Sequence, residues 1–116
     1  MKRNHEKNWA NYDEGFSLGT SGTDGGAIVR DEEHQSGARM TLEEEGSSAP
    51  YTLTCGIYGW MFHTRFFTNE NEAHEAFDEM QEELEEILEA MPNERAGEEE
   101  QEDFAEELAA FIEKYP

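Results

Sequence analysis

Positive charge is scarce in this chain. The 116 residues include 8 Lys and Arg against 29 Asp and Glu, which gives a formal net charge of −21 at pH 7. A surface with this charge repels the phosphates of nucleic acids and anionic lipid headgroups. We therefore expect no nucleic-acid partner and no membrane partner, and a basic protein is the partner that the charge favours.

Cysteine and long apolar runs are also scarce. The single Cys55 excludes an internal disulfide, and a lone thiol is typical of a reducing compartment. No window approaches the roughly 18 apolar residues of a membrane span, and the basic first residues are not followed by the apolar core of a secretory signal. We expect a cytoplasmic protein.

The remaining composition fits one small domain over residues 1–116. Hydrophobic residues make up 35% of the chain, and 7 Phe, 4 Tyr and 2 Trp supply much of the area for a core. Residues 1–67 carry 10 acidic and 6 basic side chains, whereas residues 68–116 carry 19 acidic and 2 basic ones. We divide the chain into a loosely ordered N-terminus (1–14), a β half (15–67) and an acidic helical half (68–116).

Residues 27–32 and 38–44 have the pattern of two strands. In the second, apolar residues alternate with Arg, Thr and Glu, which is typical of a strand with one buried face. The short connection containing Gly37 favours an antiparallel hairpin. Residues 16–18 are a candidate for another short strand, with Phe and Leu on one face.

Residues 19–26 are rich in glycine and read GTSGTDGG. A phosphate-binding P-loop needs Gly-Lys-Ser/Thr at the start of a helix. This segment holds no lysine and precedes a predicted strand, so we interpret it as a structural loop.

The segment 51–67 is the most aromatic of the chain, and Arg65 is its only Lys, Arg, Asp or Glu. From residue 55 to residue 62 both alternating faces are apolar or small, so we expect a central strand or a strand in a dimer interface. Gly56 and Gly59 indicate a bend or a close backbone approach. One long kinked strand and a hairpin turning at residues 58–59 both fit. We favour the kinked strand because Tyr-Gly is a weaker turn signal than Asn-Gly.

Two amphipathic helices are predicted after residue 68. Asn69 with Glu72 three residues on is a capping-box signature. Apolar residues then recur at spacings of four and three, which predicts a helix over about 70–90 that ends before Pro92. A second helix is expected over about 99–114. The predicted fold class is α+β, with a three- or four-stranded antiparallel meander followed by two C-terminal amphipathic helices.

The first predicted helix carries a weak metal-binding pattern. His74 and Asp78 lie four residues apart, but the zinc-peptidase motif needs a second histidine. The same helix places four carboxylates on one ridge: Glu75, Glu79, Glu82 and Glu86. Carboxylates gathered on one helix face are normally solvated, so we predict no metal site and no cofactor.

Two further constellations are candidates for chemistry. The acidic residues 31–33 and His34 could converge with His63, although a polar turn is the ordinary explanation. Cys55 and His63 are eight residues apart, or roughly 25 Å on one extended strand. They would meet as a nucleophile and base only if the chain folds back at Gly59. We predict no catalytic residue.

The leading functional hypothesis is a non-enzymatic, acidic protein-interaction or inhibitor-type module. In size and charge alone the chain is similar to small immunity proteins that neutralise cationic toxins. One alternative is a ligand-binding domain or enzyme with a pocket between the long strand and the first helix, and another is a dimeric structural module. The residues predicted to form a ligand or partner surface are Tyr58, Trp60, His63, Arg65 and Phe67.

Overall fold

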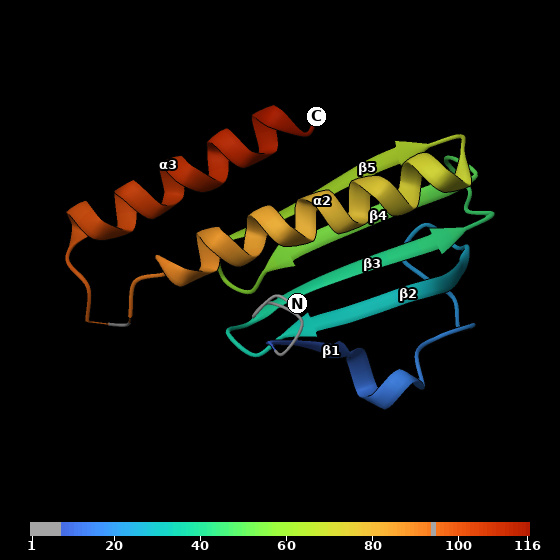
Figure 1. The fold of residues 1–116 in the computed structure, drawn as a ribbon, viewed down its shortest axis with the longest axis horizontal. Helices are drawn as coiled ribbons and strands as arrows, with labels where there is room; N and C mark the ends of the chain where they lie inside the picture. The colour runs from blue at the N-terminus through green and yellow to red at the C-terminus, as the bar shows by residue number, and fades with distance from the viewer. Residues whose placement is uncertain (1–7, 94) are drawn as a thin grey trace, which may run out of the picture.

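A computed structural model describes residues 8–93 and 95–116. One antiparallel sheet contains five strands in chain order, which are β1 (Trp9–Asn11), β2 (Ala27–His34), β3 (Ala38–Glu44), β4 (Tyr51–Ile57) and β5 (Met61–Phe67). The short helix η1 (Tyr12–Gly15) follows β1, and the helices α2 (Glu70–Glu89) and α3 (Glu98–Lys114) follow the sheet. Helix α2 lies across one face of the sheet, and α3 lies beside α2 near the β5 edge (Figure 1).

The α+β class is confirmed, as is the order of a sheet followed by two helices, but the predicted number of strands was too low. One strand that the prediction lacked is β1, in which Trp9 lies opposite His34 of β2, and another arises because residues 51–67 form the two strands β4 and β5. Strand β1 belongs to the segment 1–14 that was expected to be loosely ordered. Residues 1–7 of that segment lie outside the described residues.

The short strand predicted at residues 16–18 was wrong. The N–H groups of Phe16 and Leu18 bond back to the carbonyls of Asp13 and Gly15, which makes this segment a turn. Phe16 is 75% exposed and Leu18 is 43% exposed. A three-residue segment with two apolar side chains was too short to specify its pairing in the sheet.

The segment 51–67 is a hairpin, and the kinked strand that we favoured was wrong. Its turn is closed by the Trp60 N–H, which donates to the Ile57 carbonyl at 2.9 Å. Gly59 occupies the third position of this turn with a φ of 82°, a conformation that glycine adopts without steric cost. Gly59 therefore permits the turn even though the residue before it is Tyr and not Asn. The hairpin makes β4 a central strand and β5 an edge strand.

The main core lies between the sheet and α2. Alternate residues of β3 and β4 point toward the helix and are fully buried or nearly so; they are Ala38, Met40, Leu42, Leu53, Cys55 and Ile57. They meet the apolar stripe of α2, in which Phe77 and Met80 are also 0% exposed. The predicted cap is present, because the Asn69 side chain accepts the Glu72 N–H at 3.1 Å. The helix ends at Glu89, shortly before Pro92.

Helix α3 extends this core past the end of the hairpin. Its buried residues recur at spacings of four and three, namely Phe104, Leu108 and Phe111, and Tyr115 follows the helix. The Phe104 ring packs edge-on against Trp60 in the β4–β5 turn, with 4.7 Å between ring centroids. In the described part of the chain, neither helix has the length and apolar character needed to cross a bilayer.

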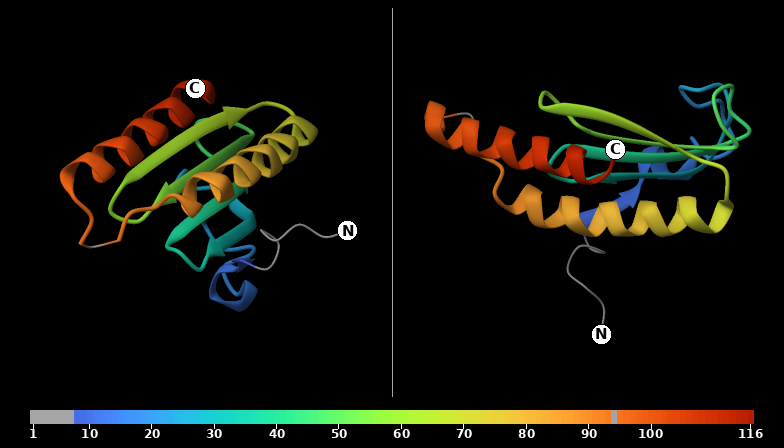
Figure 2. Two further views of the ribbon diagram at one scale, coloured as in Figure 1. Left: turned by 60° about the vertical axis from the view of Figure 1, so that its left-hand side comes forward. Right: turned by 90° about the horizontal axis from the view of Figure 1, so that it is seen from above.

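Both helices lie on the same side of the sheet, as the view from above shows (Figure 2). No helix of the described residues covers the opposite face, which we call the open face. Three large apolar side chains of the hairpin remain half-exposed or more, Tyr58 at 54%, Phe62 at 68% and Phe66 at 55%.

Candidate functional site

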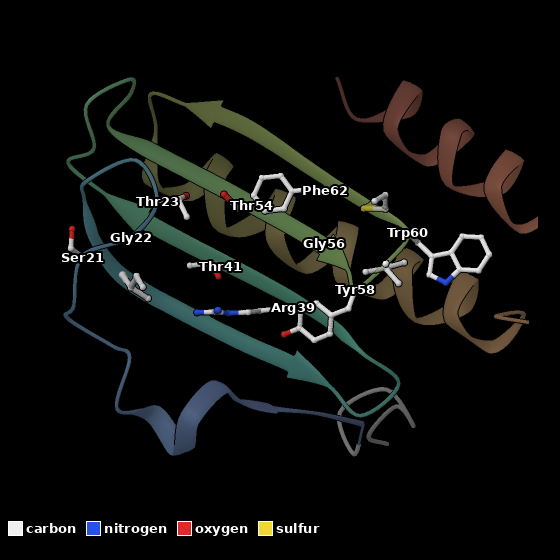
Figure 3. A pocket seen from close by; sticks show the side chains of 14 residues that line it. Ser21, Gly22, Thr23, Arg39, Thr41, Thr54, Gly56, Tyr58, Trp60 and Phe62 are labelled. Atoms are coloured by element: carbon white, nitrogen blue, oxygen red, sulfur yellow. The ribbon is translucent and has the colours of Figure 1, made fainter. Parts of the chain in front are cut away.

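The open face contains a hollow of about 740 Å³. Arg39 and Thr41 of β3 line it together with Thr54 and Gly56 of β4, and Phe62 of β5 bounds one side. The loop at residues 21–23 forms part of the rim. Figure 3 looks onto this hollow, with α2 behind the sheet and Phe62 and Arg39 on either side of Gly56.

The strand register explains why the hollow exists. Gly56 lies between Arg39 on one neighbouring strand and Phe62 on the other. A Cβ atom at Gly56 would lie 3.3 Å from the Met61 carbonyl oxygen and 3.5 Å from the Phe62 ring. Because glycine has no side chain, the backbone of β4 forms an open floor between the guanidinium and the aromatic ring.

The Arg39 side chain is held by a buried carboxylate. Its Nε and Nη2 atoms donate to the two oxygens of Asp31 at 2.8 and 2.6 Å, and the Asp31 side chain is 0% exposed. These hydrogen bonds raise the pKa of Arg39. The Thr41 hydroxyl also donates to Asp31, and the Tyr12 ring lies over the guanidinium at 3.6 Å. The geometry of a two-point ion pair fixes the guanidinium plane at the edge of the hollow.

Two hydroxyl groups of the hollow differ in their bonding. Thr54 is 8% exposed, and its Oγ1 has no hydrogen-bond partner among the described residues. A buried hydroxyl left unpaired costs about 1–3 kcal/mol, so this group gains from any partner that reaches it. Tyr58 instead donates to Glu33 at 2.8 Å, and desolvation raises the pKa of Tyr58 to about 12. Tyr58 is therefore uncharged at neutral pH.

The glycine-rich loop is tied to the sheet by Glu43, which is 1% exposed. Its Oε1 accepts the N–H groups of Asp24 at 3.0 Å and Gly26 at 2.9 Å. A Cβ atom at Gly22 would lie 2.5 Å from Oε2 of the same carboxylate, so any larger residue here would displace the Glu43 side chain from its place in the loop. Two N–H groups of the loop thus bond to the protein's own carboxylate, where a phosphate-binding loop would present them to a ligand.

A second carboxylate joins this loop to the β3–β4 connection. Asp24 accepts the N–H and hydroxyl of Ser48 at 2.9 and 2.8 Å and the Thr52 hydroxyl at 2.9 Å. These hydrogen bonds, chiefly the one from the Ser48 N–H, lower the pKa of Asp24 from its ordinary value of 3.8.

The Asp24→Asn variant is expected to melt at a lower temperature than the wild type at neutral pH. Because the folded-state pKa of Asp24 lies below the unfolded one, its stabilising effect is present above about pH 4 and is lost as the pH falls through the folded-state pKa. The difference in melting temperature between the two proteins should therefore shrink below about pH 4. Calorimetric scans across this range test it, and a difference that stays constant into the acid range contradicts it.

The structure places the five predicted surface residues on opposite faces of the hairpin. Tyr58 and Trp60 line the hollow, although the Trp60 indole points away from it toward α3 (Figure 3). His63 and Arg65 lie on the helix side, where they bond to the carbonyls of Tyr115 and Pro116.

Phe67, the fifth of these residues, is also on the helix side, with its ring 4.9 Å from the Arg65 guanidinium. Arg39, Thr54 and Phe62 were not among the predicted site residues. The signal that would have found them is their strand register across Gly56.

Cys55 and His63 face each other across the hairpin, as the fold-back alternative required. Cys55 is 0% exposed, and burial raises the pKa of its thiol to about 12. Since the thiolate is the reactive form, this cysteine is not a nucleophile at neutral pH. The space between β4 and α2, where a pocket was one expectation, contains the fully buried Phe77 and Met80.

The residues 31–34 do not converge with His63. Strands β3 and β4 lie between β2 and β5, so the distance between β2 and β5 is about 14 Å at the usual strand spacing. Asp31 lies on the open face with Arg39, whereas His34 points to the helix layer and bonds to Glu85 of α2. Within residues 8–93 and 95–116, no group of three or more His, Cys, Asp or Glu is placed to share a metal ion.

No protein-family model, curated protein or solved structure matches this chain. The hollow and the distribution of charge are therefore the features of this chain that bear on its function. The hollow combines an exposed aromatic wall, a fixed cation and an unpaired hydroxyl, which is the usual chemistry of a site that binds a small molecule.

Proposed function

We propose that this protein is a non-enzymatic binding module whose recognition site is the hollow on the open face. The observation that carries the proposal is the exposure of Phe62, 68%, beside a hollow of about 740 Å³. A large apolar side chain at the wall of a concave site gains free energy when a ligand covers it. A volume of this size is typical of sites for small organic molecules.

The residues around the hollow are held in place by the protein itself, without a ligand, and this favours binding. Asp31 holds Arg39, Glu43 holds the rim loop, and β3 and β4 supply the floor. A rigid site loses less conformational entropy on binding than a mobile one. The recognition groups therefore lie on regular strands or on a clamped loop.

Binding of naphthol, an uncharged fluorescent aromatic, tests the proposal. The Phe62→Ala variant is expected to bind naphthol about tenfold more weakly than the wild type, because it loses the apolar wall. Phe66→Ala is the matched control: Phe66 lies on the same strand and is 55% exposed, but it does not line the hollow. Equal affinities of the Phe62→Ala variant and the wild type would contradict the proposal, as would a complete absence of binding.

The association state must be measured alongside, since a homodimer that stacks two open faces would cover the same rings. Sedimentation equilibrium that finds only monomer at micromolar concentration excludes such a dimer. A dimer that dissociates in both Phe62→Ala and Phe66→Ala would instead assign the open face to self-association.

A basic protein partner is a second candidate, and the acidic helices favour it. Seven exposed acidic side chains lie on α2 and eight on α3, on the opposite side of the sheet from the open face. Such a surface would serve an inhibitor-type protein in the reducing cytoplasm that the lone cysteine suggests. The affinity of any captured basic partner should fall steeply with added salt and in a variant with the exposed α3 glutamates changed to Gln. An affinity that does not depend on salt contradicts this candidate.

A further inference from the structure

Arg39, paired with Asp31, is the only charged side chain among the residues that line the hollow. Asp31 occupies Nε and Nη2 of the guanidinium, and Nη1 has no hydrogen-bond partner among the described residues. The ion pair is therefore a dipole whose positive end is directed away from Asp31. The Arg39 side chain is 32% exposed, so a ligand in the hollow can reach it.

The other groups that line the hollow do not oppose this polarity. No Asp or Glu is among its lining residues, and Tyr58 stays uncharged because its pKa is about 12. Hydroxyl groups of Ser21, Thr23, Thr41 and Thr54 complete the polar lining. The Thr54 hydroxyl has no hydrogen-bond partner among the described residues and is closed to solvent, so a ligand oxygen would satisfy this donor by displacing the side chains that cover it.

The floor and the opposite wall of the hollow suit a flat apolar body. Gly56 leaves the β4 backbone uncovered between Arg39 and Phe62, and the exposed ring of Phe62 stands beside this floor. An aromatic ligand can stack against such a ring in the offset or edge-on arrangement that aromatic pairs prefer.

We infer that the hollow takes a planar, apolar small molecule that carries an oxygen hydrogen-bond acceptor, with its body against Phe62 and its oxygen accepting from Arg39 Nη1 and the Thr54 hydroxyl. This inference depends on the proposed function and names the class of ligand for the same site. A neutral amide and a carboxylate share the acceptor chemistry, and separate arms of the experiment distinguish them.

The test compares naphthamide, naphthoate and naphthamidine, substituted at the same ring position and titrated by calorimetry at physiological ionic strength. The amidine has nearly the shape of the amide but carries only donors. The net charge of −21 alone would favour the cationic amidine. The hollow predicts the reverse, with the amide or the carboxylate bound about tenfold more tightly than the amidine.

Two variants locate the bound oxygen. Thr54→Val removes the unpaired hydroxyl with little change of shape, so the variant is expected to fold and to bind the amide about fivefold more weakly. Phe66→Ala should bind all three compounds as the wild type does. An unchanged affinity for the amide in Thr54→Val would overturn the role of the hydroxyl.

The outcomes separate the inference from the function on which it depends. If the amidine binds as tightly as the amide, and both are weakened by Phe62→Ala, the ligand class is wrong and the binding site stands. If neither naphthol nor any of the three compounds binds, the proposed function itself fails. A tighter amide identifies a neutral ligand, and a tighter naphthoate identifies an organic acid.

Discussion

The Arg39→Ala variant is expected to lose about 3–4 kcal/mol of the free energy of unfolding. The substitution leaves the carboxylate of Asp31, which is 0% exposed, without its positive partner. Removing only the cationic partner of a buried carboxylate is more damaging than removing both residues, because the remaining charge stays desolvated. Urea denaturation followed by circular dichroism gives the free energy of unfolding.

Two controls show whether the loss comes from the stranded charge. The double variant Asp31→Ala/Arg39→Ala should recover much of the lost stability, since it removes the uncompensated carboxylate. Lys114→Ala breaks an ion pair with Glu83 at the surface, where the Lys114 side chain is 58% exposed. This variant should leave the free energy of unfolding nearly unchanged. A loss of less than about 1 kcal/mol for Arg39→Ala would show that Asp31 does not depend on this partner.

The Phe77→Ala variant is expected to lose about 4 kcal/mol of the free energy of unfolding. Phe77 is 0% exposed at the centre of the α2 stripe, and the Arg30 guanidinium lies 3.8 Å from its ring centroid. Truncation leaves a cavity between the sheet and the helix that neither can readily close, because β3 and β4 are fixed by their hydrogen bonds. The free energy of unfolding of a small domain is about 5–15 kcal/mol in total, so the variant should melt at a much lower temperature than the wild type.

Phe66→Ala provides the matched control for this loss. It makes the same chemical change at a ring that is 55% exposed on the open face. The expected loss is below about 1 kcal/mol, since less apolar area is returned to water and no cavity forms. Equal losses for the two variants would contradict the assignment of the core to the helix side of the sheet. Calorimetric melting curves of both variants suffice for the comparison.

The helices were predictable because their signals are local. Asn69 and Glu72 lie within one turn of each other, and the apolar spacing that follows extends over the whole of α2. Both the cap and the stripe require only the geometry of one helix. The predicted ranges 70–90 and 99–114 therefore agree with Glu70–Glu89 and Glu98–Lys114 to within one residue.

The sheet was less predictable, since strand pairing depends on distant residues. Residues 9–11 contain one large apolar side chain, and they become β1 only because β2 offers an edge to which they pair. The hairpin in residues 51–67 depended on the single backbone conformation at Gly59. Two glycines in that segment, 56 and 59, carried the same sequence signal, but Gly59 makes the turn and Gly56 forms the floor of the hollow.

The sequence by itself determined the α+β class, the two helices, the strand alternation in β3 and the concentration of acidic residues after residue 68. Only the tertiary structure decided that residues 51–67 fold back at Gly59, and with it where the hollow lies. The alternation of β4 separates Leu53, Cys55 and Ile57 from Thr52, Thr54 and Gly56, so the face that packs against α2 was already marked in the sequence. The sequence did not show that the pairing of β3, β4 and β5 places Arg39, Gly56 and Phe62 in one row, because strand register depends on residues far apart in the chain.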